Sequence, residues 1–282
     1  MDGLFDWFIG SYHDPRLLPV TVYTVLVGMA AFALFAGGYT WLSVRDPVWA
    51  RRYKIQNTRG AGTLSEEEAE KRNILIPGKR MVRLSLKSWI INNAWMIAGT
   101  VSAWPLMSLS GVHLGPLPPL WVIAWQLVFF IYLDDFLYYW MHRGMHTRFL
   151  LKHVHGWHHR VLTPWAITGH YMHPLEYVLT GTLAFIGPAI VGAHVVTLWI
   201  WIIFRQWEGS EGHCGYALPW SPTRFLPFSH GALHHDFHHA RVRGNYAGFL
   251  PLWDRLFGTY VRDYEKSIGE WSAHRCKRRV HP

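Results

Sequence analysis

The sequence is short of charged residues and of cysteine. Asp, Glu, Lys and Arg together make up 16% of the 282 residues, whereas soluble domains usually contain about 25%. The two cysteines, Cys214 and Cys276, do not form a CxxC pair. They are too few for a disulfide framework, and their spacing excludes zinc-finger and iron–sulfur sites.

Motifs that mark several soluble enzyme classes are also missing. The sequence has no GxGxxG segment after a strand and no phosphate-binding loop, so it does not predict a nucleotide site of its own. The HExxH signature of zinc proteases is absent as well. A redox reaction on this chain would therefore need reducing equivalents from another protein.

Four apolar stretches indicate an integral membrane protein. Trp is abundant, with 17 residues, and half of the chain is hydrophobic. The last stretch is interrupted at Gly187-Pro188 and at Gly192, which leaves open whether it crosses the bilayer or returns as a helical hairpin. We predict an all-α membrane bundle with about four transmembrane segments, each near the length needed for a ~30 Å core: Leu18–Val44, Trp89–Val112, Leu117–Met141 and Tyr177–Phe204.

The distribution of basic residues predicts the orientation of this bundle. Residues 45–88 contain 11 Lys and Arg, whereas the turn 111–116 contains none. By the positive-inside rule, residues 45–88, 142–176 and the tail from Arg205 face the cytosol. The net charge of +9 is explained by this topology and by anionic lipid headgroups, so nucleic-acid binding is not expected. We divide the chain into an N-terminal membrane region, 1–116, and a catalytic domain, 117–282.

Histidine is unusually frequent, with 19 residues against 18 Asp and Glu combined. Residues three or four apart share one face of a helix, so each of three clusters can present several imidazoles together. A structural zinc site takes four ligands, and eight clustered histidines exceed one such site. Two metal ions are therefore predicted, held by an HxxxH box and two HxxHH boxes that form a cytosolic helical cap: His142 and His146; His155, His158 and His159; and His235, His238 and His239.

Acidic and phenolic residues near the boxes are candidates for supporting roles. Asp135 lies two helical turns before His142 and shares that face with Tyr138 and Tyr139. A metal-bound histidine usually donates its second N–H to a carboxylate or carbonyl, so we predict that Asp135 orients His142. Asp134 points elsewhere and is expected to be structural. Weaker carboxylate candidates are Glu176, Glu208, Glu211 and Asp236.

Three long runs resemble the fatty-acid hydroxylase and sterol desaturase superfamily of membrane di-iron enzymes. They are DDFLYYWMHRGMH, KHVHGWHHRVLTPWAITGHYMHPLE and HHDFHHARVRGNYAGFLPLWDRLFGT. The segment IIFRQWEGSEGHCGYALPW is similar to the 4-methylsterol monooxygenases within that superfamily. The likeness covers about residues 120–260, and the first 110 residues share only hydropathy with it.

The resemblance implies further ligands, a cofactor and partners. It adds His173 and His213 to the metal ligands and leaves His170, His230 and His234 outside. It also implies two iron ions, O2, and electrons from NAD(P)H through cytochrome b5 and its reductase. The implied reaction hydroxylates the C4 methyl group of a 4-methylsterol at the endoplasmic reticulum membrane, with the boxes cytosolic. Asp135, Tyr139 and Glu176 are the candidate catalytic residues.

Other functions remain open at this point. The segment Gly212-His213-Cys214-Gly215 also occurs in the related sphinganine C4-hydroxylases, and a cholesterol 25-hydroxylase-like enzyme or a desaturase would use the same scaffold. A non-catalytic membrane metal carrier is the alternative outside this class. A carrier would place polar ligands inside its membrane spans, whereas these boxes lie beyond the apolar stretches.

Overall fold

The computed structural model describes residues 2–56, 65–248 and 250–261, and within them it contains helices but no β-strand. Part of the predicted cytosolic loop, 57–64, and the tail 262–282 lie outside the described residues. The α-helices are α1 (Asp2–Ser11), α2 (Thr24–Arg45), α3 (Val48–Arg51), α4 (Glu66–Lys71), α5 (Lys79–Ser102), α6 (Trp104–Met107), α7 (Leu120–Met145), α8 (Arg148–His153), α9 (Pro174–Val191), α10 (Val195–Gly212), α11 (Ala232–Arg241) and α12 (Leu252–Leu256).

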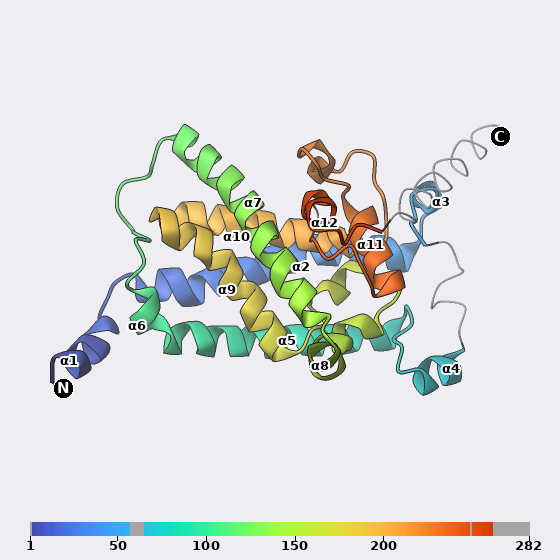
Figure 1. The fold of residues 1–282 in the computed structure, drawn as a ribbon, viewed down its shortest axis with the longest axis horizontal. Helices are drawn as coiled ribbons and strands as arrows, with labels where there is room; N and C mark the ends of the chain where they lie inside the picture. The colour runs from blue at the N-terminus through green and yellow to red at the C-terminus, as the bar shows by residue number, and fades with distance from the viewer. Residues whose placement is uncertain (1, 57–64, 249, 262–282) are drawn as a thin grey trace.

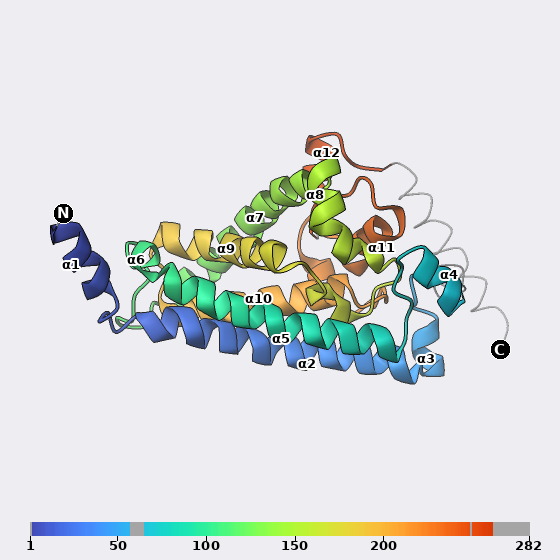
Figure 2. The ribbon, with the colours of Figure 1, turned by 90° about the horizontal axis from the view of Figure 1, so that it is seen from below.

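Three long helices, α2, α5 and α10, run along the length of the molecule, and α7 and α9 are inclined to them (Figure 1). Helices α2 and α5 lie side by side along one edge (Figure 2), and α2 packs closely against α10. Buried side chains of α2, α7 and α10, among them Phe32, Phe130 and Trp201, fill the spaces between them. The predicted all-α membrane bundle is confirmed.

Three helical segments are long and apolar enough to cross a membrane: Pro19–Arg45, Leu120–Met145 and Pro174–Val191. The second predicted stretch, Trp89–Val112, is different in the structure. Its helix, α5, begins already at Lys79 and ends at Ser102. The basic residues Lys79, Arg80, Arg83 and Lys87 belong to the same helix, and α5 is not among the three apolar candidates.

The fourth predicted stretch folds as a hairpin of two helices, α9 and α10. The reversal lies at Gly192, which ends α9 in the left-handed conformation with φ 59°, and His194 then caps the first turn of α10. The other predicted interruption is absent: Gly187 and Pro188 lie within α9. A close fit explains the small residue there, because a Cβ on Gly187 would approach the ring of Phe130 to 2.7 Å.

A group of short elements lies toward the end of the bundle opposite α1 and α6 (Figure 1). This end contains α8, α11, α12 and two 3₁₀ helices, η3 (His155–Arg160) and η4 (Ala166–His170). These elements carry most of the clustered histidines, together with the final turn of α7. The bundle therefore has a histidine-rich cap at one end.

The hairpin reversal gives a stability prediction. A Cβ at Gly111 would come within 2.8 Å of the Gly192 Cα, so Gly111→Ala forces two backbones apart and should lower stability by about 1–3 kcal/mol. Thermal unfolding of the detergent-solubilised protein measures the effect. A Cβ at Gly99, in α5, would meet no atom within 4 Å, so Gly99→Ala should not lower stability. Equal melting temperatures for the two variants would contradict the close contact.

Candidate metal centre

Nine histidines converge into two adjacent clusters at the cap. The larger, the five-histidine cluster, contains His142, His146, His155, His159 and His238; the smaller, the four-histidine cluster, contains His158, His213, His235 and His239. The ligand atoms of each cluster lie within 4.8 Å of one another. All nine side chains except His146, which is partly exposed, are buried.

Local backbone geometry divides the boxes between the clusters. Both residues of the HxxxH box, at the end of α7, belong to the five-histidine cluster. The second box forms a 3₁₀ helix rather than an α-helix, and its neighbours His158 and His159 enter different clusters. The third box, on α11, contributes His238 to one cluster and His235 and His239 to the other. The expectation that each box presents its imidazoles to a single point therefore holds only for the first box.

Each of six imidazoles has its Nδ1 atom close to a fixed oxygen. Because that oxygen can only accept a hydrogen bond, Nδ1 carries the proton and Nε2 keeps its lone pair. The oxygens belong to three loops and two helices, so the surrounding chain sets the tautomers. The pairs are His142 with the Tyr246 carbonyl (2.6 Å), His155 with Glu176 (2.6 Å), His158 with the Tyr171 carbonyl (3.1 Å), His213 with the Gly209 carbonyl (2.8 Å), His238 with the Gly244 carbonyl (2.7 Å) and His239 with the Val161 carbonyl (2.8 Å).

The Nε2 atoms then face one another at short range. Among the histidines with a fixed tautomer, the Nε2 atoms of His142 and His155 in the five-histidine cluster are 3.0 Å apart, and those of His158 and His213 in the four-histidine cluster are 3.3 Å apart. Two unprotonated nitrogens cannot hydrogen-bond, so such lone pairs repel unless a cation lies between them. All-imidazole sites suit Zn, Cu, Fe or Ni. The donor set therefore fits metal ions, one in each cluster.

The protonation state of the histidines agrees with this use. Burial and the neighbouring imidazoles lower the pKa of His146 to about 2, and burial lowers the pKa of His158 to about 3 and of His213 to about 4. Burial also brings the pKa values of His235, His238 and His239 well below the usual value. These imidazoles are neutral near pH 7, which is the form that binds metals.

Glu176 stands in direct contact with the five-histidine cluster. It lies in the first turn of α9, a helix that begins with His173 as its N-cap and Pro174 as its first residue. Its Oε1 accepts the Nδ1 proton of His155 at 2.6 Å, and both side chains are buried. A carboxylate partner fixes the ring and increases its basicity, so Glu176 is a positioning residue for His155.

Asp135 has a different partner from the predicted one. Both ring nitrogens of His142 are already occupied, Nδ1 by the Tyr246 carbonyl and Nε2 by the cluster. The Asp135 carboxylate instead accepts the backbone N–H groups of Gly248 and Leu250. It therefore holds the loop that supplies the Tyr246 carbonyl and acts on His142 through that loop. The prediction missed this because backbone carbonyls carry no sequence signal.

Two further predicted site residues lie away from the clusters. The hydroxyl of Tyr139 is bonded to Thr259 and Arg143, and its ring stacks on Phe257. Its neighbour Tyr138 is the one whose ring lies 5.1 Å from that of His142. His173 belongs to neither cluster, and its Nδ1 accepts the Leu175 N–H as the cap of α9.

The histidines predicted to be bystanders also lie outside both clusters. His234 is buried with its Nε2 3.2 Å from Asp254, and His170 stacks on Phe32 at 3.7 Å between ring centroids. Asp254 was not identified from the sequence. It accepts the N–H groups of Tyr246 and Ala247, so it supports the same loop as Asp135. A carboxylate inside the apolar run LPLWDRLFG was the available signal.

Comparison with known proteins identifies the family to which the chain belongs. The family model for fatty acid hydroxylase matches residues 127–259, which contain all nine clustered histidines. A very-long-chain aldehyde decarbonylase of Oryza sativa subsp. indica is 35% identical over 271 residues, covering 95% of this chain and 94% of that protein. The chain belongs to the fatty acid hydroxylase family. The recognised resemblance is thereby confirmed.

Other members of the fatty acid hydroxylase family share much of the chain. Methylsterol monooxygenase 2-2 of Arabidopsis thaliana is 37% identical over 229 residues, 80% of each protein. A putative methylsterol monooxygenase of Dictyostelium discoideum is 38% identical over 151 residues, 54% of this chain and 56% of that protein. No solved structure matches the chain. The family and these relatives identify the protein as a membrane oxidoreductase with metal-binding histidine clusters.

A large cavity extends from the four-histidine cluster into the helical bundle. At one end it is lined by His213 and His235, and it continues between α2, α5, α9 and α10 as far as Val20 and Leu198. Along α10 the lining residues run from Leu198 to Gly212, which corresponds to about 21 Å at 1.5 Å per residue. Most of the wall is apolar. The cavity therefore suits an elongated hydrophobic molecule with one end at the four-histidine cluster.

The contact between Glu176 and His155 gives a test of metal affinity. Glu176→Gln keeps the shape of the side chain but removes the charge that holds the His155 ring, so metal affinity should fall about 10–100-fold. Metal retained after dialysis against graded chelator concentrations measures the change. Glu67→Gln is the control, because Glu67 makes an exposed ion pair with Lys71 on α4. Equal metal retention in both variants would contradict the positioning role of Glu176.

The positions of His173 and His213 give a second test. His213→Ala removes an imidazole from the four-histidine cluster and should reduce the metal content of the purified protein. His173→Ala should retain the metal and lose only a helix cap, about 1 kcal/mol of stability. Elemental analysis and thermal unfolding of the same preparations separate the two effects. Loss of metal from His173→Ala with an unchanged melting temperature would show that His173 is a metal ligand.

Proposed function

We propose that this protein is an O2-dependent di-iron monooxygenase that hydroxylates the C4 methyl group of a 4-methylsterol in the endoplasmic reticulum membrane. The observation that carries the proposal is the long apolar cavity that ends at the four-histidine cluster. The similarity to methylsterol monooxygenase 2-2 over 80% of both chains supports the substrate class. A rigid, elongated lipid entering from the bilayer suits the shape of this cavity.

The chain's own residues would perform several tasks in that reaction. Two bound iron ions would supply O2 activation and the cleavage of an unactivated C–H bond. The carbonyls of Tyr246 and Val161 and the carboxylate of Glu176 hold the imidazoles in the tautomer that presents Nε2. The apolar walls of the cavity exclude water and aim one end of the lipid at the cluster. Nine neutral imidazoles would leave the positive charge of the ions largely unbalanced and would therefore favour the reduced, divalent form.

The proposed electron donor is cytochrome b5 with an NAD(P)H-dependent reductase. The first support is the absence of a dinucleotide-binding motif from the sequence. The second is a set of exposed basic residues on the elements that carry the histidines, which suits an acidic donor. These residues are Arg143, Arg148, Lys152, Arg241 and Arg243. The same side of the membrane, which we propose is the cytosolic one, would hold the clusters and the donor.

A second candidate function rests on the rice relative named a very-long-chain aldehyde decarbonylase, since the likeness covers 95% of this chain. A fatty aldehyde is also a long apolar molecule, so the length of the cavity alone does not distinguish it from a sterol. The two candidates differ in product. A sterol would gain a hydroxyl group on its C4 methyl, whereas an aldehyde would lose its carbonyl carbon and become an alkane.

Reconstitution of the full chain tests the proposal. Protein in lipid nanodiscs should contain about two Fe and little Zn per chain. With cytochrome b5, its reductase, NADPH and O2, it should convert 4,4-dimethylcholestanol to the C4 hydroxymethyl product, detected by mass spectrometry. His239→Ala, with one cluster incomplete, should abolish product and lower the iron content. Alkane formation from octadecanal, without any sterol product, would replace this proposal by the second candidate.

A further inference from the structure

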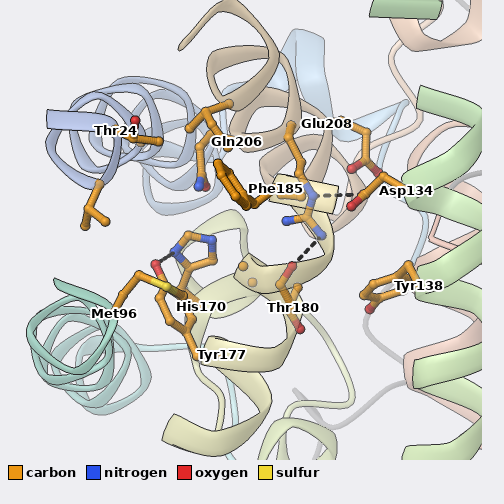
Figure 3. Close-up of a pocket in the computed structure, with 18 of the residues that line it drawn as sticks. Thr24, Met96, Asp134, Tyr138, His170, Tyr177, Thr180, Phe185, Gln206 and Glu208 are labelled. Carbon is orange, nitrogen blue, oxygen red and sulfur yellow. Dashed lines mark hydrogen bonds and ion pairs between the residues drawn. The ribbon is translucent and has the colours of Figure 1, made fainter. Parts of the chain in front are cut away.

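In its mostly apolar wall the cavity has a group of charged and polar side chains near its histidine-lined end. Asp134 on α7 and Arg205 on α10 form an ion pair with Oδ2 and Nε 2.9 Å apart, and Arg205 also donates to the Thr180 carbonyl of α9 at 3.3 Å. Glu208 lies one turn further along α10, and Figure 3 shows it beside this pair. Asp134, Thr180, Arg205 and Glu208 are here called the polar site.

The polar site has more hydrogen-bonding capacity than the protein uses. Asp134 and Thr180 are both more than nine-tenths buried, yet Asp134 Oδ1 and Thr180 Oγ1 have no hydrogen-bond partner. Within the described residues, no hydrogen bond reaches the Glu208 carboxylate. Arg205 has five N–H groups, and its two contacts use only part of them.

Unused polar groups in such a place require an explanation. Leaving a buried donor or acceptor unpaired destabilises a protein, and ionisable residues within a membrane bundle are costly and usually functional. None of the four residues belongs to either histidine cluster, so metal binding does not account for them. A ligand that forms the missing hydrogen bonds would account for these four residues.

The chemistry of the polar site selects one kind of ligand group. Arg205 offers free donors, whereas Asp134 Oδ1 and Glu208 offer free acceptors. A carboxylate would meet two acidic side chains, an aldehyde carbonyl only accepts, and an ammonium group would meet Arg205. A hydroxyl group both donates and accepts. We propose that the polar site binds a hydroxyl group of the lipid substrate.

The location of the polar site fixes which part of the lipid reacts. Glu208 lies in α10, and His213, five residues later, is the residue at which this helix ends. Five helical residues correspond to a rise of about 7.5 Å. On the other side of the polar site the cavity continues past Ile202 and Leu198 between apolar residues. The hydroxyl-bearing end therefore lies near the metals and the hydrocarbon lies away from them.

This inference rests on the proposed lipid oxidation and narrows it. The oxidised carbon must lie within a few bonds of the hydroxyl, as a C4 methyl does beside a C3 hydroxyl. Oxidation at the far end of a sterol side chain, or in the middle of an acyl chain, does not fit. The cholesterol 25-hydroxylase-like and desaturase alternatives are thereby disfavoured on geometry.

A binding experiment tests the polar site without turnover. The full chain in nanodiscs is titrated with tritiated 4,4-dimethylcholestanol and with its 3-deoxy analogue, 4,4-dimethylcholestane. The alcohol should bind about 10–100-fold more tightly, since a hydrogen bond to a charged group contributes about 1.5–3 kcal/mol. Glu208→Gln and Thr180→Val should weaken binding of the alcohol by about 10-fold and leave binding of the hydrocarbon unchanged. These variants preserve the Asp134–Arg205 pair, which also joins α7 to α10.

The control is Thr100→Val, because the Thr100 hydroxyl lines the same cavity but is bonded to the Met96 carbonyl of its own helix. It should change the binding of both lipids by the same factor. Equal binding of the alcohol and the hydrocarbon by the wild type would overturn the polar site, as would a Glu208→Gln variant that weakens both equally.

A second lipid pair separates this inference from the proposed substrate. 1-Octadecanol, which carries a hydroxyl group on a flexible chain, and octadecanal, which carries none, are titrated against the same variants. Binding of 1-octadecanol that depends on Glu208 and Thr180, without binding of the sterol, would uphold the hydroxyl site and overturn the sterol substrate. Binding of octadecanal that ignores both substitutions, without binding of either hydroxyl lipid, would overturn both.

Discussion

The arrangement of the cap depends on one repeated interaction, a hydrogen bond from the Nδ1 atom of a histidine to a fixed oxygen. Six of the nine clustered imidazoles make it, five to backbone carbonyls and one to Glu176. A carbonyl can serve in this way only if its loop is held in place. Asp135 and Asp254 provide that support by accepting the N–H groups of residues 246–248 and of Leu250. Buried acids far from the metals are therefore part of the metal site.

The helical bundle forms the cavity, and the cap supplies the imidazoles. The long helices enclose an apolar space, and the short elements at one end close it with imidazoles. Charged groups occur where the two parts meet, at the junction of α7, α9 and α10. A protein that only stored or moved metal would need neither the apolar space nor this junction. The combination favours a reaction on a lipid over transport of an ion.

The sequence was most informative where spacing alone determines position. The three boxes supplied eight of the nine clustered histidines, and the family resemblance added His213. It was less informative where a residue's direction depends on backbone geometry. The second box is a 3₁₀ helix, so α-helical spacing could not assign its members to a cluster. Pro188 lies inside α9, and the Ala184 carbonyl, which receives no N–H from a proline four residues later, accepts the indole N–H of Trp201 instead. The His173 resemblance identified a nearby histidine, but in the structure its ring caps a helix.

The 3₁₀ turn of the second box has a mechanical consequence. His158 and His159 are joined by one peptide bond, yet they enter different clusters, and their ring centroids are 5.8 Å apart. A shift of this turn cannot alter one centre without altering the other. The distance between the two clusters is thereby set by the covalent geometry of a single turn, and a substitution that unwinds this turn would displace one imidazole from each cluster.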